Sequence, residues 1–192
     1  MCGIAGYVGD RESADVLVDA LSKLEYRGYD SAGIAVFDHG NIKVKKCKGR
    51  LANLVEKMDE EGKPQGHVGI GHTRWATHGE PSDINSHPHG NKRVTIVHNG
   101  IIENYKKLKD FLIGEGYSFA SETDTEVAAK LLDYYYDGDP MKTIAKVLSE
   151  IKGSYALGIM FRDFPDEIFA VRKDSPLIVG VGEHENFIAS DV

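Results

Sequence analysis

The stretch Cys2-Gly3-Ile4-Ala5-Gly6-Tyr7-Val8 opens the chain directly after Met1, and its residues 3–8 predict a short strand. Hydrophobic periodicity predicts further strands at 33–37, 42–47, 68–72 and 94–98, and then, after a run of helices, at 154–162, 167–171, 177–181 and 186–189. Helical patterns occupy 13–24, 51–58, 104–113, 125–136 and 141–151. Because strands and helices come in separate runs, we expect an α+β layered fold with helices segregated to the sheet faces.

Three local signals refine this prediction. Ser13 stands where an N-cap would begin the first helix. Asp38-His39-Gly40-Asn41 is a polar, glycine-containing connection typical of a hairpin. The stretch from Thr73 to Arg93 is long and has few core-forming residues, and such loops in compact domains are usually functional.

Length and composition indicate one globular domain. The chain has 192 residues, of which 41% are hydrophobic and 28% charged. Its longest apolar stretch, Tyr155–Phe161, is far shorter than the ~20 residues of a membrane span. Charged residues interrupt the first twenty positions, which excludes a secretory signal peptide and predicts a cytoplasmic location. The net charge of −7 argues against nucleic-acid binding.

Neither a disulfide framework nor a metal site is expected. Cys2 and Cys47 are too few for such a framework. Five of the eight histidines fall between the two central strands, but their spacing matches no known zinc pattern and could equally order a loop. No phosphate-binding glycine motif is present, so no nucleotide cofactor is predicted.

Cys2 is the first candidate for chemistry. If Met1 is removed, Cys2 carries both a thiol and a free α-amine, whose ordinary pKa of ~8 suits a general base for that thiol. The alternative is a small hydrophobic residue that leads into the first strand.

His98-Asn99-Gly100 is the second candidate, placed where the predicted strand 94–98 ends. A turn there would aim the Asn99 amide and the Gly100 N–H outward, as donors to an oxyanion. Asn-Gly is also a common turn dipeptide with no catalytic role.

Two charged residues, Arg74 and Asp124, are candidates for ligand binding. Arg74 could grip a carboxylate and Trp75 could form part of a lid, although a surface ion pair and a core tryptophan are equally open. Asp124 could bind an ammonium group or cap the helix that follows it.

Taken together, five ordered motifs resemble one family closely. They are Cys2-Gly3-Ile4, the segment 26–33 (YRGYDSAG), the segment 72–79 (HTRWATHG), the segment 98–105 (HNGIIENY) and the segment 121–126 (SETDTE). The family comprises the N-terminal glutaminase domains of glucosamine-6-phosphate synthases, also called glutamine–fructose-6-phosphate aminotransferases, within the class II glutamine amidotransferases. The match runs along essentially the whole chain.

This resemblance implies an N-terminal-nucleophile fold, a four-layer αββα sandwich of two antiparallel sheets. It also implies roles for nine residues and no cofactor. Cys2 would be nucleophile and, through its α-amine, base; Asn99 and Gly100 would form the oxyanion hole; Arg74 and Asp124 would hold the α-carboxylate and α-amino group of L-glutamine; Trp75, Thr77 and His78 would belong to a closing loop; and Arg27 would order the surroundings of Cys2.

The resemblance further implies hydrolysis of glutamine to glutamate and ammonia. Residues 1–192 would form a glutaminase domain truncated at its C-terminus, without the isomerase domains through which a full-length, homo-oligomeric enzyme uses fructose 6-phosphate. Two alternatives remain. One is the glutaminase domain of another class II enzyme, such as an amidophosphoribosyltransferase, and the other is a non-catalytic amino-acid-binding module if Met1 is retained.

Overall fold

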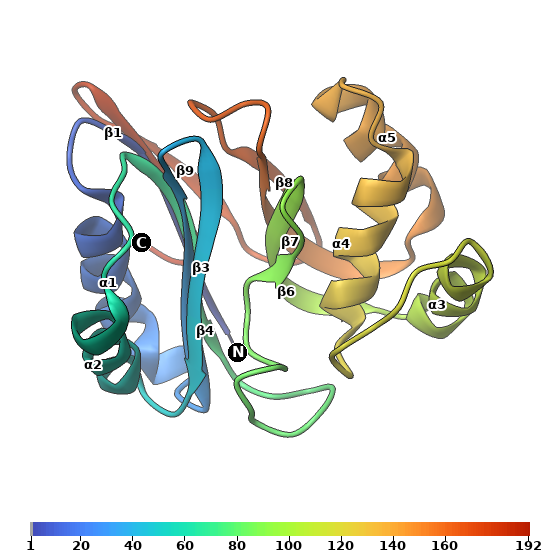
Figure 1. The fold of residues 1–192 in the computed structure, drawn as a ribbon, viewed down its shortest axis with the longest axis horizontal. Helices are drawn as coiled ribbons and strands as arrows, with labels where there is room; N and C mark the ends of the chain where they lie inside the picture. Colours follow the sequence, from blue (N-terminus) through green and yellow to red (C-terminus); the bar gives the residue numbers. More distant parts are fainter. Residues whose placement is uncertain (1) are drawn as a thin grey trace.

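In a computed structural model that describes residues 2–192, two antiparallel sheets lie face to face with helices on both outer sides (Figure 1). The first sheet has six strands in the order β3 (Asn41–Lys48), β2 (Ser31–Asp38), β4 (Val68–Arg74), β1 (Gly3–Gly9), β10 (Glu185–Ala189), β9 (Ile178–Val181). The second has four, in the order β5 (His89–Gly90), β6 (Val94–Ile102), β7 (Gly153–Phe161), β8 (Phe169–Lys173).

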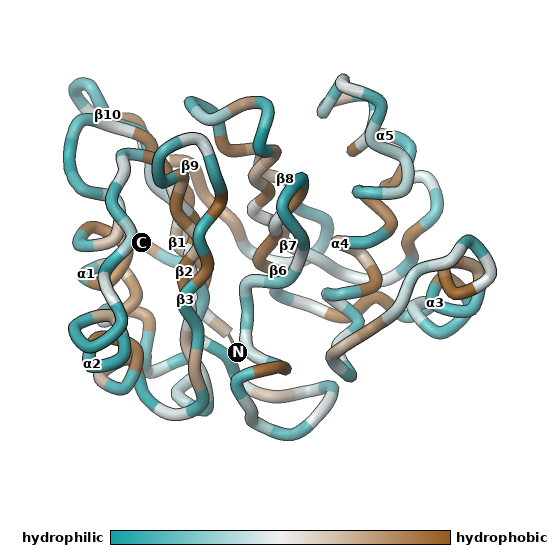
Figure 2. Tube along the Cα trace, in the orientation of Figure 1, coloured by the Kyte–Doolittle hydropathy of each residue, from teal (hydrophilic) through white to brown (hydrophobic). Residues whose placement is uncertain are grey.

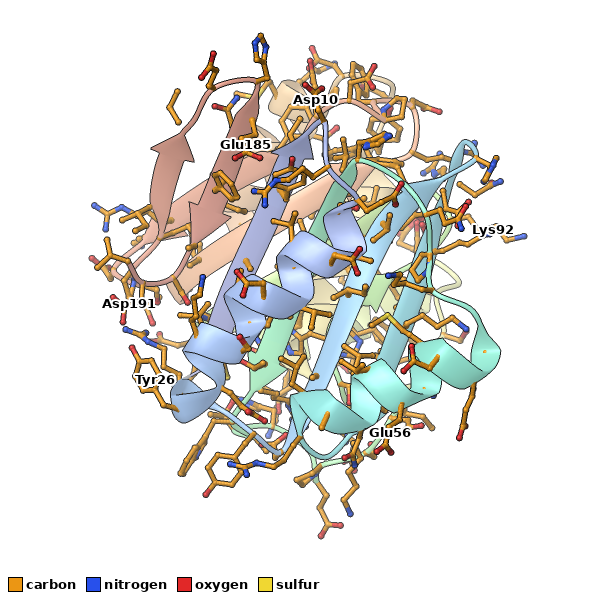
Figure 3. All side chains as sticks on the ribbon, turned by 90° about the vertical axis from the view of Figure 1, so that its left-hand side faces the viewer. Asp10, Tyr26, Glu56, Lys92, Glu185 and Asp191 are labelled. Carbon is orange, nitrogen blue, oxygen red and sulfur yellow. The ribbon has the colours of Figure 1, made fainter. Side chains whose placement is uncertain are left out.

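Helices cover the outer face of each sheet. Beside the six-stranded sheet lie α1 (Ser13–Leu24), its short 3-10 extension η1 (Glu25–Arg27) and α2 (Leu51–Glu61), as Figure 3 shows face-on. Beside the four-stranded sheet lie α3 (Tyr105–Gly114), α4 (Asp124–Tyr135) and α5 (Pro140–Glu150). The expected α+β order of layers, helix-sheet-sheet-helix, is therefore confirmed.

Alternation along the strands produces three hydrophobic layers. In β1, Ile4 and Val8 pack between the sheets, whereas Ala5 and Tyr7 pack against the α1 and α2 side. A strand places successive side chains on opposite faces, so a strand buried on both faces supplies two cores at once. Figure 2 shows the hydrophobic residues gathered along the strands, with hydrophilic residues in the outer loops.

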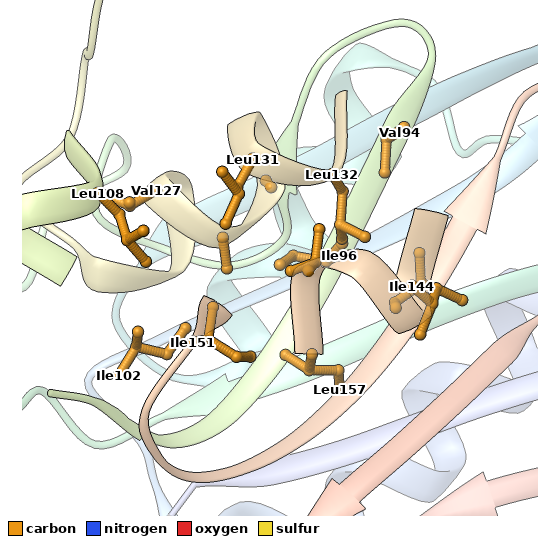
Figure 4. Close-up of a cluster of buried hydrophobic side chains, with 14 of the residues drawn as sticks. Val94, Ile96, Ile102, Leu108, Val127, Leu131, Leu132, Ile144, Ile151 and Leu157 are labelled. Atoms are coloured by element: carbon orange, nitrogen blue, oxygen red, sulfur yellow. The ribbon is translucent and has the colours of Figure 1, made fainter. Parts of the chain in front are cut away.

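The four-stranded sheet follows the same rule. Ile96 of β6 and Leu157 of β7 face α4 and form one core with Leu131 and Leu132 (Figure 4), and burial of each such side chain stabilises the fold by about 1.5–3 kcal/mol. Val97 faces the other sheet. Asn99 lies two residues beyond Val97 on the same strand, so its side chain also faces the six-stranded sheet.

The first strand pairs with one of the last. β1 lies between β4 and β10, with Ala5 opposite Ala189. Just outside this ladder, Ile4 N–H donates to Ser190 Oγ (2.9 Å), and Ser190 N–H donates to the Ile4 carbonyl (3.0 Å). The start of the chain is thus held in the middle of a sheet by residues near position 190.

Most predicted elements are confirmed, whereas of three local predictions, a hairpin at 38–41, a cap at Ser13 and a turn at 98–100, only the first is correct. The hairpin is confirmed: Asp38 pairs with Asn41, and both central residues, His39 and Gly40, have positive φ, as a tight two-residue turn requires. The cap at Ser13 is wrong, because Ser13 is already helical and its hydroxyl donates to the Gly66 carbonyl (2.8 Å).

The turn predicted at residues 98–100 is also wrong. β6 continues to Ile102, with Asn99 opposite Ala156 and Gly100 opposite Tyr155 in β7. Gly100 has φ +110°, which a glycine adopts without strain, so the strand accommodates the irregularity without reversing. No helix in residues 2–192 is both long and apolar enough to cross a membrane.

Candidate active site

A cavity of about 370 Å³ opens between the two sheets, where β1 begins, β4 ends and α4 begins. Its volume is in the range of small-molecule sites. All nine residues assigned to the site from the sequence line it, together with several that were not: Cys2, Arg27, Arg74, Trp75, Thr77, His78, Asn99, Gly100 and Asp124 from the first group, and His87, His98, Ile101, Thr123, Thr125, Ser154, Ser175 and Pro176 from the second.

Cys2 brings a thiol to this cavity from the position just before β1. The Trp75 N–H donates to Cys2 Sγ (3.0 Å), and Sγ lies 3.4 Å from the Trp75 carbonyl oxygen. Burial raises the pKa of the Cys2 thiol, and this outweighs the Trp75 hydrogen bond, which lowers it. The resting group is therefore a thiol, and a nucleophilic role requires a base beside it.

Asn99 approaches Cys2 from the opposite sheet. Its Nδ2 donates to the Cys2 carbonyl (2.8 Å), and its Oδ1 accepts from His72 Nε2 (2.9 Å). The next residue, Gly100, also lines the cavity. An amide donor next to a thiol is the arrangement that stabilises negative charge on a carbonyl oxygen under attack.

Arg74 places a buried positive charge at the end of β4. Its side chain, in a residue only 3% exposed, donates to three carbonyls of the following loop, those of His78, Gly79 (3.1 Å) and Glu80 (3.4 Å). The alternative of a surface ion pair is therefore wrong. Within residues 2–192 this guanidinium donates to carbonyl oxygens alone, which leaves its charge available to an anionic ligand.

Asp124 places a buried negative charge at the start of α4. Its Oδ2 accepts from the Ile102 N–H (2.8 Å), and its Oδ1 lies 4.0 Å from His78 Nδ1. The alternative of a helix cap is wrong, because the capping side chain is that of Thr123, which accepts from Glu126 N–H. The cavity wall thus offers the Asp124 carboxylate and the Arg74 guanidinium to a ligand with charges of both signs.

The remaining predicted residues form the rim. Arg27 pairs with Asp191 (2.7 Å), and Figure 3 shows Asp191 beside Tyr26 at the end of α1. Trp75 is 49% exposed and packs edge-on against Tyr29, so the alternative of a core tryptophan is wrong.

The loop after β4 continues this rim. Thr77 Oγ1 lies 3.3 Å from His78 Nδ1. The His78 ring packs edge-on against Tyr105, with ring centroids 5.1 Å apart. The second of these contacts links the loop to the start of α3.

Sequence reasoning missed a layer of buried histidines at the back of the cavity, of which His87 and His98 line it. His72 stacks on His87 with ring centroids 4.0 Å apart, and His98 Nδ1 lies 2.9 Å from Thr125 Oγ1. Burial lowers the pKa of His72 and of His89 to about 3, so both rings are neutral at pH 7. Five histidines between positions 72 and 98 were the available signal. No group in the described chain has three or more side chains placed to hold a metal ion.

Comparison with known proteins decides the family. The model of the glutamine amidotransferase domain family matches residues 72–192. This chain belongs to the glutamine amidotransferase domain family. It is 60% identical, over its whole length, to the glutamine–fructose-6-phosphate aminotransferase [isomerizing] of Clostridium tetani, and 53% identical to one from Thermus thermophilus. The chain spans about a third of the length of these curated relatives (32%).

Solved amidotransferase structures support the same assignment. The glutamine phosphoribosylpyrophosphate amidotransferase from B. subtilis, complexed with ADP and GMP, matches 98% of this chain and 42% of its own with a TM-score of 0.85 and 29% identity. The expected N-terminal-nucleophile sandwich of the amidotransferase family is therefore confirmed. The chain is thus more similar in sequence to the fructose-6-phosphate aminotransferase of Clostridium tetani (60% identity) than to this phosphoribosylpyrophosphate amidotransferase (29%).

Proposed function

We propose that this chain hydrolyses glutamine to glutamate and ammonia, with the Cys2 thiol as nucleophile. One observation carries the proposal: the Cys2 thiol and the Asn99 amide come from opposite sheets and meet at a cavity that also exposes Arg74 and Asp124. A thiol, an amide donor and two opposite charges are what an enzyme needs to attack the side-chain amide of an amino acid.

The two buried charges would orient the substrate. The α-carboxylate of glutamine would bind the Arg74 guanidinium, and its α-ammonium would bind Asp124. Each charge is fixed in place by backbone contacts, so little ordering is required when the ligand binds. With both ends held, the carboxamide of the ligand is directed toward Cys2.

The chemistry would then proceed in two stages. The thiol proton passes to the α-amine of Cys2, which is free once Met1 is removed; Met1 lies outside the described residues. The thiolate attacks the carboxamide carbon, and the resulting oxyanion accepts hydrogen bonds from Asn99 Nδ2 and Gly100 N–H. The carbon–nitrogen bond breaks as nitrogen takes the proton, and ammonia leaves. Water then hydrolyses the thioester, which releases glutamate and restores the thiol.

We further propose that residues 1–192 are the glutaminase part of a longer protein. The curated relatives are named for transfer to fructose 6-phosphate, and this chain covers a third of their length (32%). In such a protein, which we expect to be a homo-oligomer, the ammonia would convert fructose 6-phosphate to glucosamine 6-phosphate. The chain alone would only release ammonia.

Intact mass spectrometry with a diazo-ketone glutamine analogue tests the nucleophile. We expect loss of Met1 and one adduct, formed as the thiol displaces dinitrogen, which peptide mapping places on Cys2. Cys47→Ser should be labelled as fully as the wild type, whereas Cys2→Ser should not be labelled. Retained Met1, absence of an adduct or labelling at Cys47 would instead mark a non-catalytic amino-acid-binding domain.

A further inference from the structure

We infer that His72 is a positioning residue for the oxyanion site: its Nε2–H holds the Asn99 carboxamide in the orientation that turns the amide nitrogen toward Cys2. This inference rests on the proposed glutaminase function. It assigns a role to a buried side chain that does not itself line the cavity and reaches it only through Asn99.

The strand register brings the two side chains together. His72 lies on β4 two residues after Ile70, and both Ile70 and Val97 pack in the layer between the sheets. His72 and Asn99 therefore project into the same layer from opposite sheets. His72 Nε2 lies 2.9 Å from Asn99 Oδ1 and 3.0 Å from the His98 carbonyl oxygen.

The acceptors fix which nitrogen carries the proton. A backbone carbonyl can only accept, so the contact with the His98 oxygen requires a proton on His72 Nε2. The ring is fully buried and its pKa is about 3, so it is neutral and Nδ1 carries no proton. His72 thus presents a single N–H, and that N–H faces Asn99.

This N–H gives the Asn99 amide one favourable orientation. With Oδ1 toward His72, Nδ2 donates to the Cys2 carbonyl (2.8 Å). The flipped amide would set its NH₂ group against the His72 N–H and its oxygen against the Cys2 carbonyl oxygen. Both contacts would become repulsive, and the oxyanion donor would point away from the nucleophile.

Neighbouring side chains hold the His72 ring in the orientation that directs its N–H toward Asn99. His72 stacks on His87 with an interplanar angle of 10°, and His87 Nδ1 accepts from the His98 N–H (3.4 Å). In contrast, His72 Nδ1 is buried without a hydrogen-bond partner among residues 2–192. Of the two ring nitrogens, only the one that faces Asn99 has a hydrogen-bond partner in the described chain.

A matched pair of neutral substitutions tests the inference. His72→Gln places an amide nitrogen near the position of Nε2, whereas His72→Asn places one near Nδ1. We expect His72→Asn to lower the kcat of glutamine hydrolysis by about 10²-fold, as loss of an oxyanion donor does, with KM and the Kd for glutamate changed less than about threefold. His72→Gln should recover kcat to within about tenfold of the wild type.

Two controls separate positioning from folding. Asp133→Asn weakens a partly buried ion pair with Arg93 (2.8 Å) that does not line the cavity; it should lower the melting temperature but keep kcat. His72→Phe keeps a ring against His87 without an N–H, and should lose as much kcat as His72→Asn. It provides the measurement if His72→Asn does not fold.

A mutant cycle gives the decisive outcome. In an Asn99→Ala background, His72→Phe should cause no further loss of kcat, because His72 acts through Asn99. An equal loss in both backgrounds, an unchanged kcat in His72→Phe, or equal loss in the Gln and Asn variants would overturn the inference. A wild-type chain that is labelled at no residue and releases no ammonia would instead overturn the proposed function itself.

Discussion

The Cys2 thiol shares its cavity with an amide donor, Asn99, and with the charged groups of Arg74 and Asp124. If the thiol is the nucleophile, its replacement should abolish turnover and leave binding intact. Cys2→Ser should lower ammonia release by roughly 10³-fold or more, because a hydroxyl ionises far less readily than a thiol. The affinity for glutamine should persist, since Arg74 and Asp124 remain in place. Calorimetry with glutamine and an ammonia assay measure the two quantities separately.

Cys47 supplies the matched control for that substitution. It lies on β3, is buried against α2 and does not line the cavity. Cys47→Ser should keep the wild-type turnover and lose about 1–3 kcal/mol of stability, because a hydroxyl replaces an apolar contact. A turnover that depends on Cys47 as much as on Cys2 would contradict the assignment.

A second prediction at the residue scale concerns Arg74 and the binding of glutamine. Arg74→Ala should weaken glutamine binding by about 2–5 kcal/mol, because the substrate carboxylate would lose a buried partner. Arg50→Ala is the control, since this arginine lies exposed over Tyr29 and outside the cavity. Titration calorimetry with glutamate measures the Kd. An Arg74→Ala chain that binds as well as the wild type would remove the carboxylate role.

At the scale of elements, β6 carries the irregularity that positions the oxyanion donors. A Cβ on Gly100 would lie 2.2 Å from the Ser154 carbonyl oxygen, at a backbone φ of +110°. Gly100→Ala should therefore push β6 away from β7, lower stability by about 1–3 kcal/mol and reduce kcat more than KM. Gly114→Ala is the control, because nothing lies within 4 Å of its added Cβ. Equal behaviour of the two variants in urea unfolding would contradict this account.

The elements themselves were largely predictable, and the exceptions have physical causes. Helices such as α1 and α5 were located because one apolar face repeats every three to four residues. The turn at Asn99-Gly100 was wrong because this dipeptide favours positive φ, which usually marks a reversal but here lies within a strand. The two-residue strand β5 is too short to produce any periodicity.

The candidate site was predictable for side chains whose charge or nucleophilicity suggests a role, and not for the neutral side chains packed behind them. Arg74 and Asp124 could be predicted because each lies in a polar segment and carries a charge that could bind a ligand group of opposite charge. The contact of His72 with Asn99 depends on strand register, and that of Thr125 with His98 depends on packing between sheet and helix. A single sequence specifies neither.

At the scale of the whole molecule, the buried histidines set the response to acid. The pKa of His72 and of His89 is about 3 because burial disfavours the charged ring, whereas an unfolded histidine titrates near ~6.5. The unfolded chain therefore binds protons that the folded chain does not. The free energy of unfolding should have its full value above about pH 6.5. Below that pH it should fall by up to ~1.4 kcal/mol per pH unit for each of these histidines.

Urea unfolding between about pH 5 and pH 6.5 measures this slope, because carboxylates contribute mainly below that window. The pKa of Asp38, where a Gln65 N–H bond and the neighbouring His39 favour the anion, is about 2. His89→Asn should reduce the slope by the contribution of one histidine, which is at most ~1.4 kcal/mol per pH unit. An unchanged slope would mean that His89 is accessible to protons in the folded chain.

The pairing of β1 with β10 has a consequence for how this chain is made. Cys2 is synthesised long before position 190, yet the strand that follows it lies between β4 and β10. Both the N–H and the carbonyl of Ile4 are hydrogen-bonded to Ser190. A nascent chain on the ribosome cannot complete that sheet before residue 190 has emerged. The strand that follows the thiol therefore gains its second neighbour, β10, more than a hundred residues of synthesis after its first, β4.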